Sequence, residues 1–142
     1  MVEHRSPLGT IFPRFSSLVG DLIRLLDKKV TLYMTGTEIE LDSSLLTPLY
    51  DSLCQLIRHA VIQSIETPEE RRRAGKLEYG VIRLQAFSQD GNAIIEVADD
   101  GRGLEVSVSD GAHHQVSVDV VKKNIDALGG TVSVISEPGW GT

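Results

Sequence analysis

The spacing of apolar side chains predicts three long helices and one short one. Apolar residues recur three and four positions apart, which gathers them on one face of a helix, in three stretches: residues 12–29, 44–65 and 117–128. Thr67 and Pro68, followed by two glutamates, are typical of a helix start, because threonine caps free N–H groups and proline fits the first turn. This signal predicts a short helix that ends before Gly75.

Runs rich in β-branched residues separate these helices. Residues 30–35 and 38–41 are predicted to form a hairpin around Gly36, and residues 81–87 and 93–98 a second one around Asp90-Gly91. A last strand is predicted over 131–136. Strands clustered in hairpins between helices favour an α+β fold: a two-layer α/β sandwich whose mixed, mostly antiparallel sheet has helices on one face. The chain is expected to be one domain, 1–142, with a flexible lead-in over 1–10.

Composition narrows the range of functions. The 142 residues are 41% hydrophobic and 24% charged, which is typical of a folded globule. A net charge of −6 excludes a general nucleic-acid binder, since such a protein needs excess basic groups against phosphate. No apolar run reaches the roughly 18–20 residues that insert in a membrane, and the single cysteine, Cys54, suits a reducing compartment. We expect a cytoplasmic domain.

An acidic, glycine-containing turn is the first candidate site. Asp99 ends a predicted strand and is followed by Gly101 and Gly103. A carboxylate there could accept a hydrogen bond from an exocyclic amine such as that of adenine, while the glycines let a flat ligand approach the backbone. The D-x-G-x-G string alone is weak, because most such strings are acidic turns between strands.

Three segments together carry a more specific signal: 51–76 (DSLCQLIRHAVIQSIETPEERRRAGK), the turn DDGRGL, and 119–142 (DVVKKNIDALGGTVSVISEPGWGT). In combination they resemble the ATP-binding catalytic domain of CheA-type chemotaxis histidine kinases, in the ATPase superfamily of gyrase B, Hsp90 and MutL. The resemblance starts near Pro7 and runs to the last residue. It implies an α/β sandwich that holds ATP between helices and a mobile lid.

The resemblance also implies roles for individual residues. Asp99 would accept from the adenine amine, and Gly101 and Gly103 would keep the wall of the site thin. Arg58 matches an arginine of the family's helical nucleotide motif. The family's third glycine motif falls on Gly139, Gly141 and Thr142. As partners the family implies a phosphoacceptor-histidine domain and a receptor-coupling protein, with neither nucleic acid nor membrane insertion.

Several positions depart from the family's pattern on its helical motif. The family has a catalytic histidine and, four residues on, an asparagine that ligates Mg²⁺; here these positions read Gln55 and His59. The family's downstream Asp-His-Gly reads Ile62-Gln63-Ser64. Imidazole is a poor ligand for a hard cation that prefers oxygen, so the Mg²⁺ site is expected to be degraded.

The lid departs as well. Where the family's phosphate-binding loop has three glycines, this chain has His113, Gln115 and Ser117, so side chains stand where bare backbone should approach the ligand. The lid is short, and the family's final strand is absent after Thr142.

Two functions remain open. The first is an ATP-binding catalytic-type domain of a CheA-like sensor histidine kinase in two-component signalling, with weak ATP or ADP binding and weak or lost catalysis. The second is a non-catalytic pseudokinase that keeps the fold as a scaffold or docking module. The retained Asp99 favours the first, and the substituted His59 favours the second.

Other polar residues have simpler interpretations. His59, Asp110, His113 and His114 could together bind Zn²⁺, but no pair has a recognised ligand spacing, and His59 is more typical of a polar helix face. The run Arg71-Arg72-Arg73 is interpreted as a solvated helix face, with a docking patch as the alternative. Cys54 is expected to pack as a small core residue.

Overall fold

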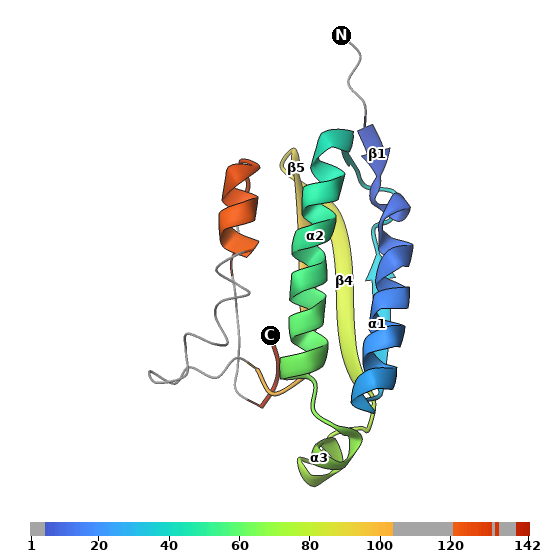
Figure 1. The fold of residues 1–142 in the computed structure, drawn as a ribbon. Coiled ribbons are helices and arrows are strands. Elements are labelled where there is room, and N and C mark those ends of the chain that lie inside the picture. Colours follow the sequence, from blue (N-terminus) through green and yellow to red (C-terminus); the bar gives the residue numbers. More distant parts are fainter. Residues whose placement is uncertain (1–4, 104–120, 132, 134–138) are drawn as a thin grey trace.

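The computed structural model describes residues 5–103, 121–131, 133 and 139–142. Two long helices, α1 (Phe12–Leu26) and α2 (Ser43–His59), lie side by side over one face of a sheet (Figure 1). The sheet contains β2 (Val30–Thr35), β4 (Gly80–Gln89) and β5 (Asn92–Asp99). This arrangement confirms the predicted two-layer sandwich with helices on one face.

The predicted helix over 44–65 has two parts. Its start is the predicted one, because the side chain of Asp42 accepts a hydrogen bond from the amide of Ser44 at 3.0 Å and caps α2. After His59 the chain continues as one π-helical turn, Ala60–Ser64. The third predicted helix is described over 121–127, where Val121 is buried and Ile125 packs against the core. The start of that helix and most of the predicted strand 131–136 lie outside the described residues.

The central strand β4 has different pairings on its two sides. With β5 it is antiparallel through the predicted two-residue turn, in which Asp90 (φ 52°) and Gly91 (φ 79°) both adopt the left-handed conformation that such a hairpin requires. With β2 it is parallel, with Val30 opposite Gly80. The sheet is therefore mixed, as expected.

The predicted hairpin over 30–41 is wrong. The strand over 30–35 pairs with β4, whereas the next strand, β3 (Glu40–Asp42), pairs in a separate two-stranded sheet with β1 (Arg5–Pro7). Gly36 (φ 87°) explains the divergence, because it turns the chain directly against β4, where a Cβ atom would lie only 2.0 Å from the carbonyl oxygen of Ala86.

The N-terminal segment contributes to the fold from Arg5 onward. Residues 5–7 are β1, and the following 3-10 turn, Leu8–Thr10, buries Leu8 completely. Residues 5–10 of the expected lead-in therefore form regular elements.

The core lies between the helices and the sheet. Alternate residues of β4 (Ile82, Leu84 and Ala86) point inward and are buried, as expected for a strand with one covered face. The helices contribute Phe12, Phe15, Val19, Leu53 and Ile57. Cys54 packs against this cluster, as predicted.

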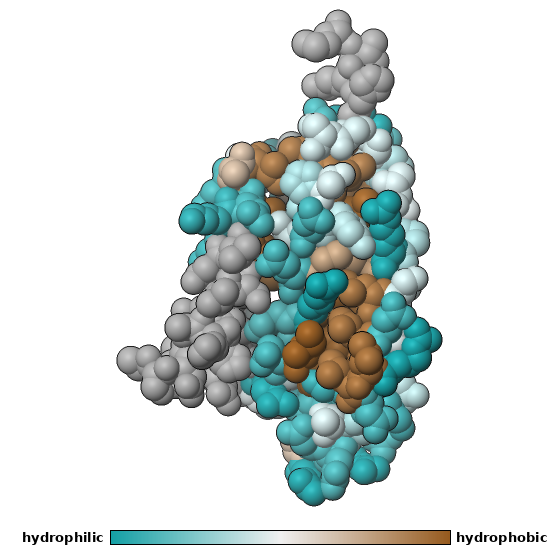
Figure 2. Space-filling view, viewed as in Figure 1, coloured by the Kyte–Doolittle hydropathy of each residue, from teal (hydrophilic) through white to brown (hydrophobic). Residues whose placement is uncertain are grey.

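The surface formed by α1 and α2 is largely hydrophilic but has an apolar patch toward their C-terminal ends (Figure 2). Leu26, which ends α1, is 37% exposed, and Ile62, just beyond α2, is 42% exposed. Among the helices in the described part of the chain, none combines the length and apolar character needed to cross a bilayer.

The close approach of Gly36 to β4 gives a test of the fold. Gly36→Ala should lower the free energy of unfolding by about 2–5 kcal/mol, because the residue has a left-handed φ and its Cβ would overlap the strand. Gly20→Ala is the matched control. Gly20 lies inside α1 with open space around it, so alanine should raise the free energy of unfolding by about 0.5–1 kcal/mol. Chemical denaturation of both variants measures the two effects; equal stabilities would contradict this role of Gly36.

Candidate functional site

Asp99 ends β5 on the face of the sheet that the helices cover. It lies opposite the fully buried Ile82, and its Oδ1 accepts hydrogen bonds from Ser64 Oγ at 2.7 Å and from the amide of Gly101 at 2.9 Å. Its own amide donates to the carbonyl oxygen of Thr142 at 2.7 Å. The candidate carboxylate is therefore held by the end of the α2 segment, by the turn that follows β5 and by the C-terminus.

The environment of Asp99 has opposing effects on its charge. Burial raises the pKa of the carboxyl group, and the neighbouring Asp100 adds to this. Hydrogen bonds from Ser64 and from the amides of Gly101 and Thr142 act in the opposite direction, because they stabilise the ionised form. Burial outweighs these donors, so the pKa of Asp99 stays above its ordinary value, although the donors favour the ionised form that can accept a hydrogen bond from an amine.

The glycines around Asp99 allow backbone segments to touch. A Cβ atom on Gly101 would lie 2.2 Å from the carbonyl oxygen of Ser64, and one on Gly141 would lie 2.0 Å from that of Asp99. Gly103 (φ 79°) and Gly139 (φ 82°) adopt the left-handed conformation. Because no side chain separates these segments, the C-terminal turn packs directly on the turn after β5.

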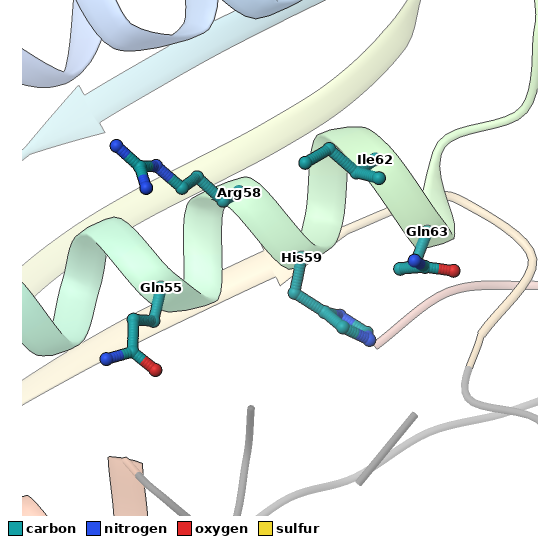
Figure 3. Close-up of a pocket in the computed structure, with 5 residues that line it drawn as sticks. All are labelled: Gln55, Arg58, His59, Ile62 and Gln63. Carbon is teal, nitrogen blue, oxygen red and sulfur yellow. The ribbon is translucent and has the colours of Figure 1, made fainter. Parts of the chain in front are cut away.

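The remaining predicted site residues lie on α2 and its π-helical extension. A small cavity of about 170 Å³ is lined by Gln55, Arg58, His59, Ile62 and Gln63. Figure 3 shows that Gln55 and His59 extend from one side of the helix and Arg58 from the other. Ligand pockets are usually about 300–1,000 Å³, so this hollow can hold only part of a nucleotide.

The lining of this cavity fits Mg²⁺ poorly. Among the described residues that line it, the side-chain oxygen ligands are the amide groups of Gln55 and Gln63, and none is a carboxylate. Mg²⁺ is usually held by one or two carboxylates. Here the imidazole of His59 is a poor ligand for Mg²⁺, and the guanidinium of Arg58 is itself a cation. Within the described residues, no three His, Cys, Asp or Glu side chains are grouped as metal ligands. The predicted phosphate-loop positions His113, Gln115 and Ser117, and the candidate zinc ligands Asp110 and His114, lie outside the described residues.

A buried arginine supports the turn that carries Asp99. The side chain of Arg71, on α3 (Pro68–Arg73), is only 2% exposed. It donates to Glu66 at 2.9 Å, to a carboxylate oxygen of Asp100 at 3.1 Å and to the carbonyl oxygen of Leu77 at 2.6 Å. The interpretation of Arg71-Arg72-Arg73 as a solvated face is thus wrong for Arg71, because four acceptor oxygens surround it, the fourth being the carbonyl oxygen of Asp100 at 3.2 Å. Arg72 and Arg73 are exposed.

Lys76 extends this group of charges. It donates to Glu66 at 2.8 Å and to the carbonyl oxygens of Asp100 and Gly101 at 3.1 and 3.0 Å. Burial alone would raise the pKa of Glu66, but the hydrogen bond from Lys76 and the nearby charge of Arg71 hold it below its ordinary value. Asp100 also accepts from the amide of Val81 at 2.7 Å. We call Glu66, Arg71, Lys76 and Asp100 the charge cluster.

Sequence reasoning missed the charge cluster and the contact of Ser64 with Asp99. The capping box of Thr67 and Glu70 that starts α3 was predictable, and it is present. The segment around α3 does contain a signal for the cluster, because acidic and basic residues flank the helix. A helix of six residues is too short to be stable without such contacts. No local signal identifies Ser64, because its partner lies 35 residues further along the chain.

Comparison with known proteins identifies the family. Residues 49–142 match the sequence profile of the histidine kinase-, DNA gyrase B- and HSP90-like ATPases. The chain belongs to this family.

Similar proteins within that family are chemotaxis histidine kinases of the CheA type. The chain is 35% identical to the chemotaxis protein CheA of Treponema pallidum and 36% identical to that of Salmonella typhimurium, each over 96% of this chain. It is 31% identical, over its full length, to the sensor histidine kinase CheAY of Helicobacter pylori. The predicted resemblance to CheA-type catalytic domains is confirmed. The chain spans 21%, 26% and 22% of the lengths of these three relatives.

Solved structures agree on the fold. The histidine kinase domain of the blue-light-activated kinase from Erythrobacter litoralis superposes with a TM-score of 0.70 at 13% identity, covering 99% of this chain and 66% of that one. The catalytic domain of the histidine kinase ThkA superposes with a TM-score of 0.66 at 14% identity, covering 99% and 91%. The predicted histidine-kinase ATPase fold is confirmed.

The role of Arg71 can be tested by removing its charge. Arg71→Met should lower the free energy of unfolding by about 3–5 kcal/mol, because Glu66 and Asp100 would keep their charges without the buried partner. Arg72→Met is the matched control: that arginine lies on the same helix but is 60% exposed, so its loss should change stability by less than about 1 kcal/mol. Urea denaturation distinguishes the two. A similar small change in both variants would mean that the cluster does not hold the turn.

Proposed function

We propose that this chain is a nucleotide-binding domain of a CheA-like sensor histidine kinase, that it binds the adenine end of ATP or ADP weakly, and that its catalysis is weak or lost. In a chemotaxis-like pathway, its partners would be a phosphoacceptor-histidine domain and a receptor-coupling protein. The membership of the family and the similarity to CheA proteins support the class of activity. The geometry around Asp99 supports binding of the adenine end, and the residues on α2 support weak or lost catalysis.

The observation that carries the adenine part is the set of donors on Asp99. A buried carboxylate that keeps its charge needs such donors, and here Ser64 and Gly101 both donate to Oδ1. Gly101 and Gly141 are buried, and their bare backbone packs against Ser64 and Asp99, which holds the carboxylate in place. A carboxylate in that position can accept from the adenine amine and discriminate against bases without one.

The phosphate end supports the loss of catalysis. Phosphoryl transfer depends on positioning and on neutralising the charge of the transferred group with Mg²⁺ and backbone N–H groups. Here Gln55 and His59 replace the expected histidine and asparagine, and the cavity that they line has no carboxylate. The alignment with the Treponema protein covers 173 positions, more than the chain's 142 residues, so that relative has segments that this chain lacks. A shortened lid accounts for such a difference.

One observation favours the scaffold alternative. Ile62, on the π-helical turn after α2, occupies the position of an acid in the family's motif and is 42% exposed. Figure 2 shows an apolar patch toward the C-terminal ends of α1 and α2. Trp140 is 81% exposed in the C-terminal turn. Exposed apolar groups beside the nucleotide site suit contact with another protein better than contact with phosphate.

The adenine contact is tested by Asp99→Asn. The amide can place a donor where the carboxylate accepts from the amine, so affinity for ADP should fall about tenfold to a hundredfold. The amide oxygen can still accept from Ser64 and Gly101, so the variant should fold and unfold near the wild-type temperature. Isothermal titration calorimetry and circular dichroism measure the two properties. Equal affinity in both proteins would make Asp99 a turn residue only.

The effect of Mg²⁺ distinguishes an active kinase from a degenerate one. We expect millimolar Mg²⁺ to change ADP and ATP affinity little and ATP turnover to be undetectable, since His59 stands at the ligand position. His59→Asn alone should not restore activity, because the phosphate loop would still lack its glycines. Calorimetry with and without Mg²⁺, and phosphorylation of an added histidine-containing domain, measure these outcomes. A Mg²⁺-dependent gain in ATP affinity, or phosphorylation of the added domain, would show that the chain is an active kinase.

A further inference from the structure

The last turn of the α2 segment is a π-helix, and this determines where Ser64 lies. The amide of Ile65 donates to the carbonyl oxygen of Ala60 at 2.8 Å, five residues back rather than the four of an α-helix. The carbonyl oxygens of Val61 and Ile62 instead accept from Lys28 Nζ at 2.7 and 3.1 Å. The wider turn changes the direction of Ser64 relative to a regular helix, and Lys28 satisfies two carbonyl groups at its end.

Ser64 is enclosed and uses its hydroxyl proton on Asp99. The residue is 1% exposed, and Oγ donates to Asp99 Oδ1 at 2.7 Å. Its carbonyl oxygen accepts from the amide of Arg102 at 2.8 Å, so its backbone is tied to the same turn. The absent Cβ of Gly101 leaves room for this contact, because that atom would lie 2.5 Å from Ser64 Oγ.

Two donors on Oδ1, together with the amide of Thr142, restrict how the carboxylate can turn. The Gly101 amide is fixed by the backbone, whereas the Ser64 hydroxyl comes from a separate element, so together they hold the plane of the group from two directions. The resemblance to the kinase family places a glycine at position 64, and glycine has no hydroxyl. This hydrogen bond is therefore a feature of this chain's own sequence.

We propose that Ser64 is a positioning residue that fixes the carboxylate of Asp99 for the adenine amine and thereby sets the preference for adenine over hypoxanthine. The inference rests on the proposed adenine site. Adenine presents an amine to the carboxylate, whereas hypoxanthine presents a carbonyl oxygen, which a fixed carboxylate repels. Without Ser64 the carboxylate is held only by the amides of Gly101 and Thr142. It can then turn further and accept from the ring N–H of hypoxanthine, so the discrimination weakens.

The test compares ADP with inosine diphosphate on the whole chain. Ser64→Ala should reduce the ratio of ADP to inosine diphosphate affinity about tenfold, the loss expected for a hydrogen bond to a charged group. Ser64→Gly, which restores the family's residue, should do the same and serves if alanine impairs folding. Ser52→Ala is the matched control: Ser52 is equally buried on α2, but its hydroxyl has no hydrogen-bond partner among the described residues, so the ratio should stay unchanged.

A second measurement detects the hydrogen bond without nucleotide. In a ¹³C NMR titration of the Asp99 carboxyl group, Ser64→Ala should raise the pKa, because it removes a donor to the ionised form. Ser52→Ala should not. If wild type binds ADP and the affinity ratio is unchanged in both Ser64 variants, the positioning role is wrong and the proposed function stands. If wild type does not bind ADP, the proposed adenine site fails and this inference fails with it.

Discussion

The buried guanidinium of Arg71 is the interaction on which the candidate site depends. A cation that is 2% exposed is tolerated only where acceptors surround it. Its two carboxylate partners come from separate segments: Glu66 lies just before α3, and Asp100 lies just after β5. Because both carboxylates converge on one cation, the short helix α3, the strand β4 and the turn after β5 hold one another in place. The six residues of α3 would be marginal as an isolated helix.

This constraint also separates the roles of two adjacent acids. Successive residues at the end of a strand point to opposite faces of the sheet. Asp100 binds Arg71 and the amide of Val81, so its charge stabilises the fold, whereas Asp99 lies on the helix-covered face with Ser64. A structural acid thus fixes the backbone from which the candidate ligand-binding acid extends. The two acids of the sequence DDG thus have different roles, and only their contacts in the folded structure distinguish them.

The sequence predicted what depends on local periodicity and failed where distant segments decide. The period of apolar residues placed α1 and α2 correctly, and the turn chemistry of Asp90-Gly91 placed the hairpin of β4 and β5. The strand over 30–35 was assigned to the wrong neighbour because its partner, β4, starts 50 residues later, and adjacency in sequence favoured a hairpin.

The same reasoning applies to the candidate site. Asp99 was identified because a strand followed by an acid and glycines is a local pattern, and the family resemblance gave it a role. Arg71 was misassigned because a run of three arginines has the same local pattern whether or not one of them is buried; its partner Asp100 lies 29 residues away. Ser64 was noted only as a departure from the family, since its contact with Asp99 depends on a π-turn that the residue pattern does not show.

The two ends of the proposed site differ in how strongly the fold depends on them. The adenine end is built from buried Ser64, Gly101 and Gly141, whose contacts also join the α2 segment, the turn after β5 and the C-terminus, so substitutions there disturb the packing. At the other end, the substituted Gln55 and His59 on α2 are half-buried, whereas Ile62 on the π-helical turn is exposed. Exposed positions accept substitution at little cost in stability. Replacing Ile62 should therefore cost the fold little, whereas a substitution at Ser64, Gly101 or Gly141 alters the packing that holds Asp99.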